Sequence, residues 1–250
     1  MISDTWYLFK KYMTITLRMP LWSLFTLIQP MIWLVIFGQL FGAFVQKSDG
    51  NYVDFMVPGI LIMTVLFGSS WSGVSLLREI SSGTVDKMLV APVSRVAIVL
   101  SRVLHSAVQV LAQTLIILIV AWSMGSTISM NPINILLGLL IVFLLGIGFA
   151  AISNGFAITL QREEPLVMIG NLMTLPLMFF SSALVPEQFI PKWIQYISVI
   201  NPISYAVDAV RAILTTPVDS HLFIKGLILM SIFATATLIW AVTAFKALRD

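Results

Sequence analysis

The stretch that decides the fold is VLHSAVQVLAQTLIILIVAWSMGSTISMNPINILLGLLIVFLLGIGFAAISNGFAITLQ, residues 103–161, which contains no Asp, Glu, Lys or Arg. A helix needs about 20 mostly apolar residues to cross the hydrocarbon core of a bilayer, so this stretch is long enough for two spans. Asn131-Pro132 divides it, because such a dipeptide favours a turn. We therefore predict two membrane helices, over about 103–124 and 133–157.

The other gaps between charged residues predict four further spans. These lie over about 21–45, 55–77, 165–185 and 226–245. Of the 250 residues, 59% are hydrophobic and 10% charged, whereas soluble domains have about 25% charged residues. The sequence therefore predicts an all-α integral membrane protein with six transmembrane helices, forming one domain over residues 1–250.

The distribution of positive charge predicts the orientation. Six spans place both termini on one side, and that side then carries ten of the 14 Lys and Arg residues. The remaining four are Lys47, Lys192, Arg211 and Lys225. Because cytoplasmic loops are enriched in Lys and Arg, we expect both termini in the cytoplasm.

Two segments outside the spans read as helices on the side of the termini. Residues 4–18 place aromatic and basic side chains on different faces, which is typical of a helix lying in the membrane interface. This helix could serve as an anchor or could contact a partner. In the loop 78–102, Gly83 breaks the preceding helix, and Pro92 stops the next one. We predict a short helix over 84–90, whose apolar edge is Val85, Met88 and Leu89.

A helix of under two turns is not stable alone, so its apolar edge is expected to dock. The surface that it meets is either another protein or the chain's own N-terminal helix.

Residues 186–220 are too long for a plain loop, and they predict two short helices on the opposite side. Asn201-Pro202 separates them, and Ser204 could cap the second, over 205–214. We predict an external re-entrant hairpin over 187–214, between spans five and six, in which Asp208 and Arg211 pair at i, i+3. The alternative is a pair of helices lying flat in the interface.

No ionisable side chain lies centrally in a predicted span, which argues against an ion-coupled carrier. Uncharged polar groups remain there, and they either line a substrate path or form hydrogen bonds between helices. They are Gln29, His105, Gln109, Gln113, Asn154 and Asn171.

The sequence offers no catalytic residues and no metal site. Cysteine is absent, the two histidines are far apart, and no phosphate-binding loop of the Walker type occurs. If the protein moves a solute uphill, the energy must enter through a partner, and no cofactor is expected in this chain. An ion-coupled carrier and a non-transporting assembly factor are the alternatives.

The run PLMFFSSALVPEQFIPKWIQYISVINPISYAVDAVRAIL (176–214) resembles the hallmark region of the ABC-2 type transporter permeases. The branch that exports drugs and lipooligosaccharides is the most similar, including the daunorubicin-resistance and nodulation permeases. SSGTVDKMLVAPVSRVAIVLSR (81–102) resembles the first cytoplasmic loop of the same family.

This resemblance implies a multidrug-resistance type of exporter in a bacterial or archaeal plasma membrane. Two permease copies, as a homodimer, would pair with two copies of a separate ATPase that holds ATP and Mg²⁺. The cargo would be amphipathic, namely a drug, a lipid or a lipid-linked sugar, and nucleic acid would not be a partner. The path would run between the permease copies, lined by spans one, two and five.

The resemblance also implies roles for particular residues. Contact with the ATPase would fall to a coupling helix and its surroundings: Glu79, Gly83, Thr84, Val85, Asp86, Lys87, Met88 and Leu89. The external gate would comprise Pro186, Pro191, Trp193, Asn201, Pro202, Tyr205, Asp208 and Arg211.

Overall fold

The computed structural model describes residues 2–40, 52–90, 93–184, 191–215 and 217–246, and every regular element in these ranges is a helix. The elements are α1 (Ile2–Arg18), α2 (Pro20–Ile32), the π-helical turn η1 (Trp33–Phe37), α4 (Tyr52–Ser70), α5 (Ser72–Ser81), α6 (Thr84–Val90), α7 (Arg95–Ser123), α8 (Pro132–Leu160), α9 (Glu163–Phe179), α10 (Lys192–Ser198), α11 (Pro202–Leu214) and α12 (Ser220–Lys246).

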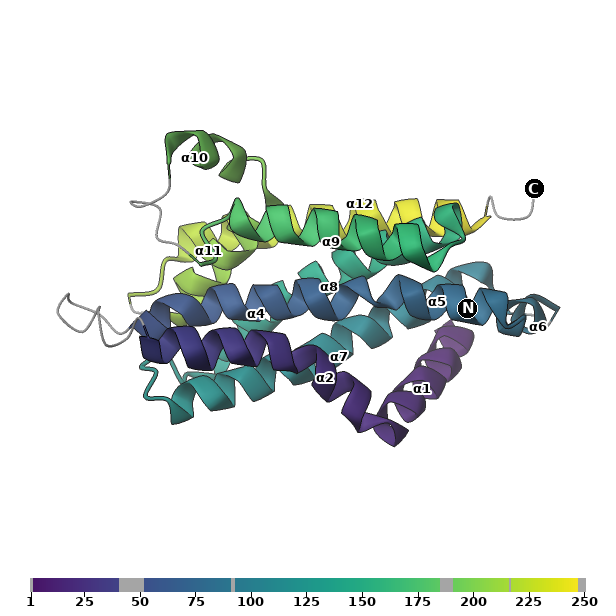
Figure 1. Ribbon diagram of the computed structural model, residues 1–250, viewed down its shortest axis with the longest axis horizontal. Coiled ribbons are helices and arrows are strands. Elements are labelled where there is room, and N and C mark those ends of the chain that lie inside the picture. The colour runs from purple at the N-terminus through teal and green to yellow at the C-terminus, as the bar shows by residue number, and fades with distance from the viewer. Residues whose placement is uncertain (1, 41–51, 91–92, 185–190, 216, 247–250) are drawn as a thin grey trace.

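The long helices lie side by side along the long axis of the molecule (Figure 1). The helix α1 diverges from α2, α6 lies at one end of the bundle, and α10 lies at the other. The Arg95 guanidinium donates to the carbonyl oxygen of Lys246 at 3.1 Å, which joins the start of α7 to the end of α12. Both ends of the described chain therefore lie at the α6 end of the bundle.

Four helical segments are long and apolar enough to cross a membrane. They are Tyr52–Ser81, Arg95–Ser123, Pro132–Leu160 and Ser220–Lys246. The apolar helix Phe25–Leu40 and α9 are shorter, although both lie alongside the long helices. The chain is thus a multi-pass membrane protein, and a count of six spans stays a prediction.

The helices α10 and α11 meet at an angle of 87°. Such a bend is shared by broken spans and re-entrant loops, so the re-entrant hairpin also stays a prediction. The second helix begins at Pro202, three residues earlier than the sequence predicted, and Asn201 caps it by accepting from the Ile203 N–H at 3.0 Å. Capping by Ser204 is therefore wrong, because proline suits the first position of a helix that asparagine caps.

The helix of the third predicted span begins at Arg95, directly after Ser94, and Arg102 lies inside it with 3% of its surface exposed. The start of the span itself, near residue 103, stays a prediction. The charge did not end the apolar segment, because a carboxylate on a neighbouring helix pairs with it.

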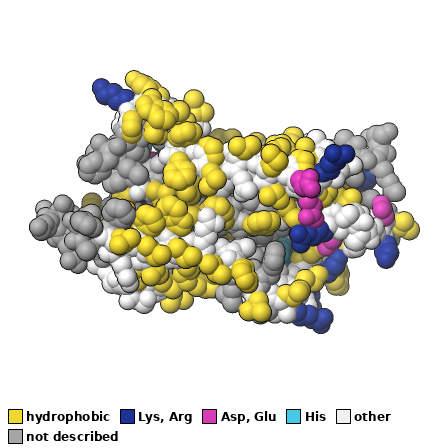
Figure 2. Space-filling model, in the orientation of Figure 1, with side chains coloured by type: hydrophobic (Ala, Val, Ile, Leu, Met, Phe, Trp, Pro, Cys, Tyr) yellow, Lys and Arg dark blue, Asp and Glu magenta, His cyan; other side chains and the backbone are white. Residues whose placement is uncertain are grey.

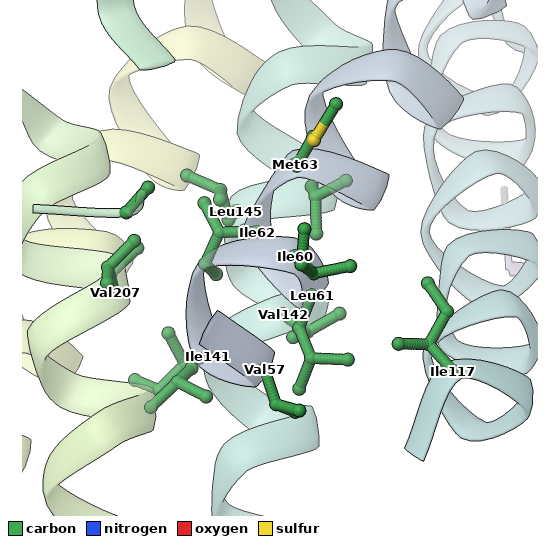
Figure 3. Packing of buried hydrophobic residues seen from close by; sticks show 14 of the residues in the cluster. Val57, Ile60, Leu61, Ile62, Met63, Ile117, Ile141, Val142, Leu145 and Val207 are labelled. Carbon is green, nitrogen blue, oxygen red and sulfur yellow. The ribbon is translucent and has the colours of Figure 1, made fainter. Parts of the chain in front are cut away.

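The core of the bundle is packed around α4 (Figure 3). The α4 side chains Val57, Ile60 and Ile62 are fully buried, as are Ile141 and Leu145 of α8. A second cluster of buried apolar side chains lies toward the α6 end and joins α5, α7 and α8. Close packing of these surfaces fixes the helices that surround the candidate site.

A one-residue interruption at Trp71 separates α4 from α5 within a single span. The Ser153 hydroxyl on α8 accepts from the Gly73 N–H at 2.9 Å and donates to the Ser70 carbonyl oxygen at 2.6 Å. Asn154 donates to the Ser72 hydroxyl at 2.8 Å. Backbone groups that the interruption frees are thus paired inside the membrane domain, where an unpaired group is costly.

Ser153→Ala should destabilise the protein by about 1–3 kcal/mol, because it leaves a buried N–H and a buried carbonyl without their partner. Thermal unfolding in mild detergent measures the effect. Thr159→Ala on the same helix is the control, since that hydroxyl donates to the Gly155 carbonyl of its own helix. Equal stability of the two variants would show that the Ser153 contacts contribute nothing.

Candidate functional site

Charged side chains gather at the α6 end of the bundle, whereas hydrophobic side chains cover most of the middle of the visible face (Figure 2). At this end the Arg78 Nε atom lies 3.0 Å from Glu163 Oε1, which ties α5 to the start of α9. The basic and acidic groups therefore mark a polar boundary beside an apolar belt, as expected where a bundle leaves the hydrocarbon region.

Four side chains join α1, α5 and α7 in what we name the Glu79 cluster: Lys11, Tyr12, Glu79 and Arg102. The Tyr12 hydroxyl donates to Glu79 Oε2 at 3.1 Å, and Arg102 forms an ion pair with the same oxygen. Lys11 Nζ lies 3.8 Å from Glu79 Oε1. The Arg102 guanidinium lies 4.7 Å from the centre of the Tyr12 ring. Burial of the guanidinium is costly, and these contacts offset the cost.

The Tyr12 pKa is raised to about 12 from its ordinary value of 10.0, chiefly because burial disfavours the phenolate, and the Glu79 carboxylate adds to the effect. Below pH 10 the phenol keeps its proton in both the folded and the unfolded chain. Between the two values only the unfolded chain loses it, so stability should fall by about 2–3 kcal/mol as the pH rises through this window.

Tyr12→Phe should flatten this part of the pH profile. Thermal unfolding of wild type and variant across the window checks it, and absorbance of tyrosinate should show one fewer late-titrating tyrosine in the variant. A wild type and a variant that lose stability in parallel would contradict the assignment to Tyr12.

The short helix α6 has the bounds that the sequence predicts, Thr84–Val90. Gly83 has φ +68°, a left-handed conformation that glycine adopts readily at the end of a helix such as α5. Asp86 and Lys87 are exposed, and Val90 is 86% exposed.

The docking edge predicted for this helix needs correction at Val85. This side chain is 2% exposed and packs in the second core cluster with side chains of α5 and α7, and Met88 is partly buried against the same cluster. Val85 therefore meets the chain itself, but in a cluster built mainly from α5, α7 and α8 rather than on the N-terminal helix that the alternative named. Among the α6 side chains that the structure describes, Asp86, Lys87 and Val90 are exposed, and the side chain of Leu89 lies outside the described part.

Three of the polar residues predicted for the spans form hydrogen bonds between helices. Gln113 donates to the Thr26 hydroxyl at 2.6 Å, His105 Nε2 lies 2.7 Å from the Thr16 hydroxyl, and Asn154 contacts Ser72. These three side chains therefore join helices, and His105 also lines a cavity. Their part in a substrate path stays a prediction.

The other three polar residues line cavities. Gln29 and Asn171 face a cavity of about 330 Å³ between α2, α4 and α9. Gln109 faces a cavity of about 400 Å³ between α1, α5 and α7. These positions fit the alternative of a path, which they share with Trp71, a residue that sequence reasoning missed.

At the opposite end, the residues of the predicted gate are divided by the structure. Pro186 lies outside the described residues, Pro191 precedes α10, and Pro202 starts α11. Trp193 is 58% exposed and packs edge-on against Phe180. Tyr205 donates to the Val199 carbonyl at 2.7 Å, across the turn between the two helices.

Buried contacts fix the corner between α9, α10 and α11. Asn201 donates to the Leu177 and Phe180 carbonyls at 2.6 and 3.0 Å. Arg211 pairs with Asp208 at 3.6 Å, which confirms the predicted ion pair, and donates to the Ser182 carbonyl at 2.9 Å. Asn201, Asp208 and Arg211 thus hold the fold together, and their part in a gate is untested.

Comparison with known proteins agrees with this geometry. Residues 3–215 match the family model described as "ABC-2 type transporter". A protein of Cyanophora paradoxa named as a transport permease, ycf38, is 31% identical over 238 residues, 93% of this chain and 81% of that protein.

Two bacterial proteins named for drug resistance are also similar. The Mycobacterium tuberculosis protein DrrC, named as a doxorubicin resistance ABC transporter permease, is 30% identical over 188 residues, 74% of this chain and 67% of its own. The Streptomyces coeruleorubidus protein DrrB1, named as a daunorubicin resistance ABC transporter permease, is 22% identical over 187 residues, 75% of this chain and 66% of its own. The family match spans most of the chain, and the chain belongs to the ABC-2 type transporter family of permeases.

Proposed function

We propose that this permease exports an amphipathic molecule, using ATP hydrolysed by a separate subunit that docks on α6. Permeases of this type work with a separate ATP-binding subunit. The observation that carries the proposal is the position of α6. Its inner edge is anchored in the chain at Val85, while Asp86, Lys87 and Val90 are exposed at the end of the bundle.

Motion of α6 would reach the membrane domain through α5. The second core cluster packs α6 against α5, and the Glu79 cluster joins α5 to α1 and α7. A displacement of α6 by the ATPase would therefore move three helices together. In this proposal ATP and Mg²⁺ are held by the partner, in two copies, against a homodimer of permeases.

The cavity between α2, α4 and α9 is the proposed path for cargo, between the two permease copies. Phe25, Phe67 and Trp71 line it together with Gln29 and Asn171, so it can receive apolar surface and a few hydrogen-bonding groups. This lining and the drug-resistance names of DrrC and DrrB1 support amphipathic cargo. We place the α6 end in the cytoplasm of a bacterium or archaeon, following the excess of Lys and Arg on that side.

The test is co-purification of an ATP-hydrolysing subunit from the native membrane. We expect Lys87→Glu/Val90→Asp to lower the recovered ATPase about tenfold, since a few exposed side chains carry most of the energy of an interface. The matched control is Lys192→Glu/Val199→Asp, at the start of α10 and directly after its end, where a lysine and a valine are likewise exposed at the opposite end of the bundle. Failure to recover any ATPase with wild type would overturn the proposal, and equal loss from both variants would remove α6 as the docking site.

A further inference from the structure

Three cavities of the membrane domain adjoin one another. Trp71 lines all three, Thr26 lines the first two, and Ser75, Arg78 and Glu79 line the second and the third. We name these three adjoining cavities together the Trp71 groove. It runs from α9 and α2, past the interruption between α4 and α5, to the Glu79 cluster on α1, α5 and α7.

The two ends of the Trp71 groove differ in chemistry. The end at α9 is walled mainly by apolar side chains: Phe25, Phe67, Val74, Leu166 and Val167. The end at α1 adds charged and hydroxyl side chains to apolar ones such as Ile15 and Met19: Ser75, Arg78, Glu79, Ser82 and Arg102. A groove with one polar and one apolar end is matched by a molecule with a head group and a chain.

The buried Arg102 side chain indicates the charge of that head group. Its terminal nitrogen pairs with Glu79, but its Nε atom is buried and has no hydrogen-bond partner among the described residues. A buried donor without an acceptor is unfavourable, so a small shift of the Arg102 side chain, which lines the groove, would let a ligand oxygen satisfy it. Among the residues that line the groove, Arg78 and Arg102 carry positive charge and Glu79 carries negative charge, so two positive charges meet one negative one.

We propose that the Trp71 groove binds an amphiphile with one anionic head group, such as a phosphodiester. The head group lies against Arg102 and Arg78, and the apolar chain passes Trp71 into the cavity between α2 and α9. A planar guanidinium suits phosphate oxygens, and basic pockets between membrane helices bind anionic lipid head groups. Binding follows from the groove alone, whereas its role as cargo rests on the proposed function.

Lipid retention by the purified protein, in complex with whatever subunit co-purifies, tests the binding. The probes are phosphatidylglycerol and phosphatidylcholine with identical acyl chains, and native mass spectrometry counts the lipids retained. We expect wild type to prefer phosphatidylglycerol about tenfold, as a charge-assisted contact predicts. Arg102→Gln/Glu79→Gln, which removes both partners of the buried ion pair, should abolish the preference.

Two single variants keep the test decisive if the double variant does not fold. Arg78→Gln alters an exposed arginine of the groove and should lower the preference about threefold, as loss of one of the two arginines that line it implies. Arg95→Gln removes an arginine that bonds Lys246 and does not line the groove, so the preference should stay at the wild-type value. A folded Arg78→Gln protein with the wild-type preference, or a wild type without one, would overturn the proposal.

A separate transport assay decides whether the bound amphiphile is cargo or a resident lipid. The permease in complex with its ATPase is reconstituted into phosphatidylcholine vesicles that contain a trace of chain-labelled phosphatidylglycerol, and movement of the label across the bilayer is measured. Label that crosses the bilayer with ATP, more slowly in Arg78→Gln, identifies the groove ligand as cargo. Label that stays in place while the preference persists identifies a resident lipid. Both results support binding of the amphiphile in the groove. Because lipid retention is measured without ATP, the binding proposal can still be judged if the exporter proposal fails.

Discussion

Gly59→Ala is expected to lower the free energy of unfolding by about 3 kcal/mol or more, so little folded protein should be recovered from the membrane. A Cβ atom at this position of α4 would meet the backbone carbonyl of Ala183. Backbone atoms cannot move aside as the tip of a flexible side chain can, so α4 would have to withdraw from the segment after α9. The added methyl group is small, but it forces a shift of α4, the central helix of the core.

The effect is measured by expression level and by thermal unfolding in mild detergent. Gly170→Ala on α9 is the matched control, because a Cβ atom there has no neighbour within 4 Å. It should leave stability unchanged or slightly raised, as alanine favours a helix over glycine. Similar stability for both variants would mean that α4 and the segment after α9 do not pack as closely as the structure has them.

Arg102→Met should destabilise the protein by about 3–5 kcal/mol, because it leaves the Glu79 carboxylate next to a buried site without its main cation. Lys11 cannot replace the guanidinium, since its Nζ atom is 3.8 Å from the other carboxylate oxygen and the lysine side chain is 37% exposed. Adding Glu79→Gln should recover part of the loss, because the pair is then neutral. This recovery distinguishes the ion pair from the simple packing of a long side chain.

A double-mutant cycle in detergent, read by thermal unfolding, measures the coupling of the two residues. Arg78→Met is the control, because Arg78 pairs with Glu163 where both side chains are exposed, at 60% and 45%. An exposed pair contributes about 0–1 kcal/mol, so this variant should be nearly as stable as wild type. Additive losses in the cycle would refute the coupling through Glu79.

Helix-breaking residues made the bounds of α6 predictable from the sequence. Gly83 and Pro92 bound a segment that can only be a short helix, and the structure has it at Thr84–Val90. The inward-facing side of α6 was predictable too, since Val85 is buried and Met88 partly buried. The surface that this side meets was not predictable, because it depends on where α5 lies.

Charge gaps located the four helices that are long and apolar enough to cross a membrane, but not the residues that matter inside them. Arg102 served as a boundary in the sequence, whereas in the structure it lies within α7, because its partner Glu79 comes from another helix. Likewise, nothing in the local pattern marks Trp71 as an interruption. The backbone groups beside the interruption pair with Ser153, which is remote in the sequence and adjacent only after α8 packs.

The polar residues of the spans show the same limit. Spacing placed His105, Gln109 and Gln113 on one stripe of a helix, but only neighbouring helices decide their roles. Thr16 and Thr26 engage the first and the last, and Gln109 is left facing a cavity. A periodic pattern gives the direction of a side chain, and the partner it meets is a property of the tertiary fold.

The interruption at Trp71 is a joint between α4 and α5 whose position is fixed by contacts with α8. Three hydrogen bonds hold it: Gly73 to Ser153, Ser153 to Ser70, and Asn154 to Ser72. All three involve side chains of α8, so α5 cannot rotate against α4 unless its hydrogen bonds with α8 break. A force applied at α6 therefore moves α5 and α4 together as one rigid span, as long as these hydrogen bonds stay intact. When a larger force breaks them, α4 and α5 can rotate relative to one another, with the Trp71 ring at the hinge.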